Sequence, residues 1–243
     1  MIICGHRGLA HVAPENTLAG LMAAHHAGLS WVEIDVQLSQ DQQVVLFHDQ
    51  RLGRCSNGHG TLREHTFAQL QALDLGSWFS NDFTNERMPL LSDYLVRACE
   101  LNIKVNIELK LYPKDCVATL CQRVGEVLAA LFSQGLLSTE QVLLSSFEPT
   151  ALAQMQQLAP TVPRALLVAS IPTDWQTQLQ QLDCEALHCE QTALTPKHAA
   201  AITEAGYRVS CYTVNKQNRA NQLASLGVHM IFSDKPLKTA PSV

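Results

Sequence analysis

Short apolar segments alternate with longer helical segments over most of the chain, and this pattern limits the possible folds more than any other feature. Residues 2–4 (IIC), 142–144 (VLL) and 165–168 (ALLV) are apolar without polar alternation, as in strands that are covered on both faces. Residues 115–134 place apolar side chains at a period near 3.6 and stop at Gly135, which is typical of a packed helix. The alternation predicts a parallel sheet with crossover helices.

Nine strand candidates are found along the 243 residues. Barrels built from eight strand–helix units often reach this length as one domain. The first strand is not followed by a GxGxxG motif, which weighs against a dinucleotide-binding fold. We therefore predict an α/β fold, a somewhat distorted (β/α)8 TIM barrel that forms a single domain over residues 1–243. The first strand is expected to pair with the last strand, which would close the barrel.

Residues 31–49 depart from this alternation, because two strand-like segments are joined by the short link 39–43. A parallel crossover needs a dozen or more residues, so the two strands are predicted to form a hairpin or a strongly distorted barrel step. A turn near residues 40–41 would place residue 33 opposite residue 48. Glu33 and Asp35 point to one face of their strand, and His48 would return beside them.

Residues 50–89 follow this third strand and contain turn residues with only one short helical stretch, at 67–73. Segments of this length carry function or have a small structure of their own. Two interpretations stay open for them. The segment is an insertion over the mouth of the site, or it is a plain excursion on the surface.

Polar side chains gather where the predicted strands end, which is the face of such barrels that carries the active site. A single acid at a strand end is more often a helix cap or a surface ion pair, and we interpret Asp234 as structural and Glu190 as a cap or rim residue. A cluster of opposite charges is costly to desolvate without a function. The members of the cluster are His6, Arg7, Glu33, Asp35, His48, Glu108 and Lys110.

These residue types together indicate phosphodiester cleavage. Three carboxylates without a thiolate are the ligands of a hard divalent cation such as Mg²⁺ or Ca²⁺. Arginine and lysine bind phosphate oxygens. Two histidines can move protons near neutral pH, one to activate the nucleophile and one to protonate the leaving alkoxide.

Composition and simple sequence patterns limit the binding partners and the cellular location that can be expected. The formal net charge is −5, and no basic run is present, so no nucleic-acid partner is expected. No apolar stretch reaches the roughly 18 residues of a membrane span, and the N-terminus lacks the pattern of a secretory signal, so no stable membrane insertion is expected. The eight cysteines form no CxxC motif and are expected to be free thiols. We predict a cytoplasmic location and leave the oligomeric state open.

Short motifs along nearly the whole chain resemble those of the glycerophosphodiester phosphodiesterases, in the order in which that family has them, and most resemble the cytosolic bacterial enzymes. The 50–89 segment is similar to an insertion typical of the family. The motifs are HRG at 6–8, PENT at 14–17, EIDV at 33–36, LFHD at 46–49, IELK at 107–110, SSF at 145–147, YTVN at 212–215 and FSDKP at 232–236.

The resemblance implies a metal-dependent hydrolase that converts glycerophosphodiesters, such as glycerophosphocholine or glycerophosphoethanolamine, to sn-glycerol 3-phosphate and an alcohol. It implies that Phe147 and Tyr212 line a glycerol pocket, although the family often has tryptophan at position 212. Glu15 would support the site from nearby, and Asn16 would cap a helix. The other implied roles are catalytic acid–base for His6 and His48, metal ligands for Glu33, Asp35 and Glu108, and phosphate binding for Arg7 and Lys110.

Three alternatives stay open at this point. The chain could be a non-catalytic phosphoester-binding barrel, or a phosphodiesterase of the lysophospholipase D type. It could also be a barrel lyase or aldolase that uses Lys110 as a Schiff base.

Overall fold

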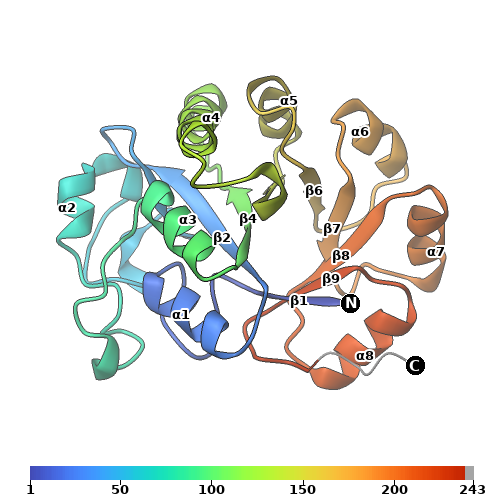
Figure 1. The fold of residues 1–243 in the computed structure, drawn as a ribbon, viewed down its shortest axis with the longest axis horizontal. Helices are drawn as coiled ribbons and strands as arrows, with labels where there is room; N and C mark the ends of the chain where they lie inside the picture. The colour runs from blue at the N-terminus through green and yellow to red at the C-terminus, as the bar shows by residue number, and fades with distance from the viewer. Residues whose placement is uncertain (239–243) are drawn as a thin grey trace.

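The strands of the protein close into a parallel barrel in the computed structural model, which describes residues 1–238 (Figure 1). β1 pairs in parallel with β9 on one side and with β2 on the other, which closes the barrel. The predicted TIM barrel is therefore confirmed, including the pairing of the first and last strands. The parallel strands are β1 (Ile2–Gly5), β2 (Trp31–Leu38), β4 (Lys104–Leu109), β5 (Val142–Ser146), β6 (Arg164–Val168), β7 (Ala186–Glu190), β8 (Arg208–Tyr212) and β9 (Met230–Ser233).

The short strand β3 (Val44–Leu46) returns antiparallel to β2, so the predicted hairpin is confirmed. The turn is closed by the amide of Ser39, which donates to the carbonyl of Gln43. The expected register was wrong in detail. Val36 pairs with Leu46 and the ladder ends there, so His48 lies beyond it rather than opposite residue 33.

Helices surround the barrel and bury apolar side chains against its strands. In α4 the buried residues Leu120, Val124, Leu128 and Leu131 follow the period near 3.6 seen in the sequence. The helix predicted over residues 115–134 begins at Val117 and ends at Ser133, within two residues of the prediction. The helices of this ring are α1 (Leu18–His26), α3 (Leu91–Glu100), α4 (Val117–Ser133), α5 (Pro149–Leu158), α6 (Trp175–Gln181), α7 (Pro196–Glu204) and α8 (Gln217–Ser225).

The segment after β3 forms a small subassembly on the hairpin. Its helix α2 lies outside the ring of helices, at the edge of the molecule (Figure 1). Leu52, Leu62 and Leu70 are buried in a cluster of their own with Val45 and Phe47 of the hairpin. Its elements are short 3₁₀ turns at Leu52–Arg54, Leu62–Glu64 and Asn81–Phe83, and α2 at Phe67–Gln71.

Among the described residues, no helix combines the length and apolar character needed to cross a membrane. The assignment of residues 1–243 to a single domain stays a prediction.

Candidate active site

Three carboxylates meet at the C-terminal ends of β2 and β4. Glu33 and Asp35 share one face of β2, and the parallel register places Asp35 beside Glu108 of β4. One oxygen from each of the three lies within 4.8 Å of the others. Glu33 and Asp35 are almost fully buried. The cluster predicted from the sequence is therefore assembled by strand register.

The charges of this cluster are only partly balanced by the protein. Burial and the charges of its carboxylate neighbours raise the pKa of Glu33 and of Glu108. Burial would also raise the pKa of Asp35, but Arg7 and Lys110 outweigh it and hold that pKa below its ordinary value. The Lys110 amine lies 2.9 Å from Glu108 Oε1 and 3.5 Å from Asp35 Oδ1. The Arg7 Nε atom lies 3.4 Å from Asp35 Oδ2.

Two buried oxygens in this region have no hydrogen-bond partner among the described residues, namely Glu33 Oε1 and Asn106 Oδ1. Asn106 pairs with Glu33 across β2 and β4. A buried acceptor without a donor is costly, and a cation would satisfy it. The three carboxylates and these free oxygens fit a hard divalent cation such as Mg²⁺ or Ca²⁺.

His6 follows β1 and lies on one side of the cluster. Its Nε2 is 3.9 Å from Glu33 Oε2, and its Nδ1 is 2.6 Å from Asp234 Oδ1. Asn215 donates to the other oxygen of Asp234 at 2.6 Å. Burial would lower the pKa of His6, but the hydrogen bond with Asp234 and the charge of Glu33 raise it overall. Asp234, which we interpreted as structural, therefore contacts a candidate catalytic histidine.

His48 follows β3 and has a different environment. Its Nδ1 lies 2.7 Å from Asp49 Oδ1, and its backbone carbonyl accepts a hydrogen bond from the Tyr112 hydroxyl at 2.6 Å. Burial lowers the pKa of His48, and the nearby Arg7 and Lys110 act in the same direction. Each histidine thus has one ring nitrogen held by an aspartate, which fixes the orientation of the ring.

The loop after β1 is shaped by two residues with positive φ. Gly8 has φ 89°, and a Cβ there would lie 2.7 Å from the backbone of Gly20 in α1, so only glycine fits. Arg7 has φ 52° and donates its backbone N–H to Glu33 Oε2 at 2.9 Å. This conformation turns the Arg7 guanidinium toward the cluster, where it also donates to Glu15 Oε1 at 2.8 Å.

Glu15 supports the site from nearby, as expected. It accepts hydrogen bonds from Arg7 and from Arg54, whose Nη1 donates to Glu15 Oε2 at 2.8 Å. Arg54 also donates to Asp49, so the segment after β3 reaches the mouth of the barrel at this residue. Sequence reasoning assigned no role to Arg54, Asp49 or Asn215, although the last two lie within the family motifs at 46–49 and 212–215.

The expected cap role of Asn16 was wrong. Thr17 caps α1 by accepting from the Gly20 amide. Asn16 is buried and bonds Asp35 twice, donating to its Oδ2 at 2.9 Å and accepting from its backbone N–H at 3.1 Å. Its φ of 55°, in a region where asparagine is tolerated better than most residues, turns it inward. Asn16 therefore holds Asp35 in place.

Phe147 and Tyr212 form an aromatic wall beside the cluster. Their ring centroids are 5.8 Å apart at an interplanar angle of 82°. They line a cavity of about 40 Å³ together with His6, Glu33 and Glu108. The Tyr212 hydroxyl donates to the carbonyl of Val168 at 2.8 Å. We call this the Phe147–Tyr212 cavity. The residues that line it come from strands all round the barrel, so the cavity lies near the barrel axis.

Comparisons with known proteins agree with this geometry. Residues 6–238 match the model of the glycerophosphoryl diester phosphodiesterase family. The Bacillus subtilis protein YhdW is 32% identical over 241 residues, with 97% of this chain and 95% of YhdW covered. The glycerophosphodiester phosphodiesterase of Caldanaerobacter subterraneus is 28% identical, with 97% and 94% covered.

Among solved structures, an Oleispira antarctica phosphodiesterase in complex with the product sn-glycerol-3-phosphate superposes with a TM-score of 0.92. It is 34% identical, and the match covers 97% of this chain and 94% of that one. The family resemblance seen in the motifs is thus confirmed by sequence and by structure. The chain belongs to the glycerophosphoryl diester phosphodiesterase family and is a phosphodiesterase of the type that hydrolyses glycerophosphodiesters.

Proposed function

We propose that this enzyme hydrolyses small glycerophosphodiesters, such as glycerophosphocholine and glycerophosphoethanolamine, to sn-glycerol 3-phosphate and an alcohol. One observation carries the proposal. Two histidines and two cationic side chains lie near the three-carboxylate cluster, which adjoins a small cavity with an aromatic wall. The Oleispira antarctica phosphodiesterase, solved in complex with the product sn-glycerol-3-phosphate, supports sn-glycerol 3-phosphate as the product.

We assign Glu33, Asp35 and Glu108 as ligands of Mg²⁺ or Ca²⁺. When bound, the cation supplies positive charge to the non-bridging phosphate oxygens and so stabilises the charge of the transition state. Arg7 and Lys110 lie against the same carboxylates and are placed to bind the remaining phosphate oxygens.

His6 and His48 are proposed as the acid–base pair. The nucleophile is either the glycerol 2-hydroxyl, through a cyclic phosphate, or a water molecule, and both require a base that accepts a proton. The leaving alkoxide requires an acid that donates one. Asp234 and Asp49 bind the Nδ1 atoms, which leaves Nε2 of each ring for proton transfer. Phe147 and Tyr212 would pack against the glycerol carbons.

The structure weighs against Lys110 as a Schiff-base lysine. Such a lysine needs a pKa below its ordinary value so that its amine is neutral. Burial would lower the pKa of Lys110, but the adjacent Asp35 and Glu108 carboxylates raise it well above its usual range. The Lys110 amine is therefore charged and suited to binding an anion.

We further propose a small-molecule substrate rather than nucleic acid, and a cytoplasmic location. The net charge of −5 supports the first point. The eight cysteines, all free, support the second, because disulfides form mainly in oxidising compartments.

The test is release of sn-glycerol 3-phosphate from glycerophosphocholine by the purified protein, compared with Glu108→Gln. That substitution keeps the size of the side chain but removes a ligand charge, and we expect it to abolish most of the release. A matched control is Glu204→Gln, an exposed glutamate of α7. No release by the folded wild-type protein would overturn the proposed substrate class.

A further inference from the structure

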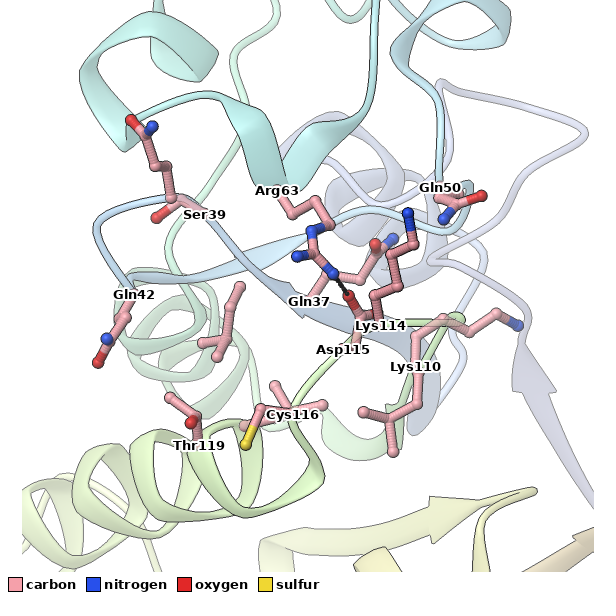
Figure 2. Close-up of a pocket in the computed structure, with 14 residues that line it drawn as sticks. Gln37, Ser39, Gln42, Gln50, Arg63, Lys110, Lys114, Asp115, Cys116 and Thr119 are labelled. Carbon is pink, nitrogen blue, oxygen red and sulfur yellow. Dashed lines mark hydrogen bonds and ion pairs between the residues drawn. The ribbon is translucent and has the colours of Figure 1, made fainter.

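A second cavity, of about 230 Å³, lies outside the barrel mouth between the β2–β3 hairpin, the segment after β3 and the first turn of α4 (Figure 2). We call it the Arg63–Lys114 cavity. Nothing in the reaction as described so far uses it. Residues that line it include Gln37, Gln50, Arg63, Lys110, Lys114 and Asp115.

This cavity adjoins the catalytic cluster through Lys110. In Figure 2 the Lys110 side chain runs away from the other labelled residues, and its amine reaches Glu108 and Asp35. Gln37 lies two residues beyond Asp35 on the same face of β2 and donates to the carbonyls of Phe47 and Asp49, on either side of His48. The cavity is therefore on the His48 side of the cluster.

The two cavities thus lie on different sides of the carboxylates. The Phe147–Tyr212 cavity is near the barrel axis and includes His6. The Arg63–Lys114 cavity is toward the outside and borders the segment that carries His48. A phosphodiester has two organic substituents on one phosphorus, so a phosphate at the cluster would direct one substituent toward each cavity.

The Arg63–Lys114 cavity carries excess positive charge. Its one acid, Asp115, is already engaged by the Arg63 Nη1 atom at 3.2 Å and by the Tyr112 amide at 2.7 Å. Within residues 1–238, Arg63 makes no other side-chain hydrogen bond, and the exposed Lys114 makes no ion pair. The Lys114 amine and two guanidinium nitrogens of Arg63 are therefore free to bind an anionic ligand.

We propose that the Arg63–Lys114 cavity binds the alcohol half of the substrate and favours alcohols that carry a negative charge, such as a phosphorylated polyol, over choline. The inference rests on the proposed function and refines it. A quaternary ammonium group in this cavity would meet two cations and no free carboxylate, whereas a second phosphate would meet the donors left open by Arg63 and Lys114.

The test compares kcat/KM for three substrates that release the same product, sn-glycerol 3-phosphate. They are glycerophosphoinositol 4-phosphate, glycerophosphoinositol and glycerophosphocholine. The first two differ only by the added phosphate. We expect the phosphorylated compound to be preferred over each of the others by about threefold to tenfold, since two partly exposed cations act on it. The preference should shrink as ionic strength rises.

Lys114→Gln should reduce this preference to about twofold or less, because Lys114 has no partner in the fold whose loss would disturb the loop. Arg63→Gln should act in the same direction. The matched control is Lys197→Gln, an exposed lysine of α7 outside both cavities, which should keep the wild-type preference.

Equal or better use of glycerophosphocholine by the wild-type enzyme would overturn the inference, as would a preference that both cavity variants retain. Either outcome would leave the proposed function intact, because product would still form. Hydrolysis of none of the three substrates would overturn the proposed function, and this inference with it.

Discussion

Asp35 shows how single residues hold the site together. It is buried, yet its pKa stays below the ordinary value because Arg7, Lys110 and Asn16 surround it with positive charge and a donor N–H. Glu33 accepts a hydrogen bond from the Arg7 backbone N–H and lies near His6, but burial and its carboxylate neighbours outweigh both and raise its pKa. The site therefore keeps one carboxylate ionised by its neighbours and leaves others to be balanced by a bound cation.

The two histidines give the most direct test at this scale. His6→Ala and His48→Ala should each lower kcat by roughly 10²–10⁴-fold, because each would remove one proton-transfer group. Steady-state release of sn-glycerol 3-phosphate measures the effect. His59→Ala, which alters an exposed histidine after β3, should keep wild-type kcat. Near-normal turnover in either site variant would remove that histidine from the proposed role.

Asp234 is expected to act through His6. Asp234→Asn would remove the negative charge that helps to raise the pKa of His6. It would also weaken the hydrogen bond that orients the His6 imidazole ring. We expect kcat to fall about tenfold to a hundredfold, as for other residues that orient a catalytic imidazole. The limb of the pH–rate profile that reports His6 should shift to lower pH. A purely structural role for Asp234 would lower the yield of folded enzyme without that shift.

Elements contribute through register and through local capping. The parallel register of β2 and β4 places Asp35 beside Glu108, so two residues far apart in sequence become joint ligand candidates.

In the segment after β3, one carboxylate organises a whole loop. Asp74 accepts from the backbone N–H groups of Asn85, Gly76 and Ser77. These bonds favour the ionised form and hold the pKa of Asp74 well below its usual range.

Asp74→Asn should therefore lower the free energy of unfolding at pH 7. We expect a loss of only about 1–2 kcal/mol, because solvent around this loop screens the charge of Asp74. Because the pKa is depressed in the folded state, this contribution is fully present above the unfolded pKa of about 4 and is lost as pH falls toward the folded pKa. Urea unfolding of both proteins at pH 7, 5 and 3 measures it. A difference that does not shrink below pH 4 would contradict the capping explanation.

At the scale of the whole molecule, barrel closure brings residues beside the first strand and beside the last strand into one site. His6 and Asp234 are 228 residues apart and touch only because β1 pairs with β9.

The sequence predicts the alternation of strands and helices, the hairpin and the carboxylates at strand ends. These features are predictable because they depend on local periodicity and on one rule for parallel strands.

What the sequence could not reveal depends on long-range side-chain geometry. Asn16 and Thr17 are both good caps, and only the positive φ of Asn16 sends it to Asp35 instead. Arg54 gave no signal, because its contact with Glu15 requires the segment after β3 to fold back onto the mouth. Asp234 precedes a lysine and a proline, a context that is as typical of a plain turn as of a site.

Metal binding should also stabilise the whole molecule. A ligand that binds the folded state alone at 100 times its Kd adds about 2.7 kcal/mol, which for a chain of this size raises Tm by roughly 5–10 °C. Thermal unfolding with and without Mg²⁺ or Ca²⁺ measures the shift. Glu33→Gln should show a much smaller shift than the wild-type protein. Equal shifts in both would contradict Glu33 as a ligand.

The central claim is that hydrolysis of a glycerophosphodiester depends on a cation held by Glu33, Asp35 and Glu108. It is tested most directly by measuring sn-glycerol 3-phosphate released from glycerophosphocholine before EDTA treatment, after it, and after Mg²⁺ or Ca²⁺ is restored. We expect EDTA to abolish release and one of the two cations to restore it. Release that continues unchanged after EDTA has removed all metal would contradict the claim.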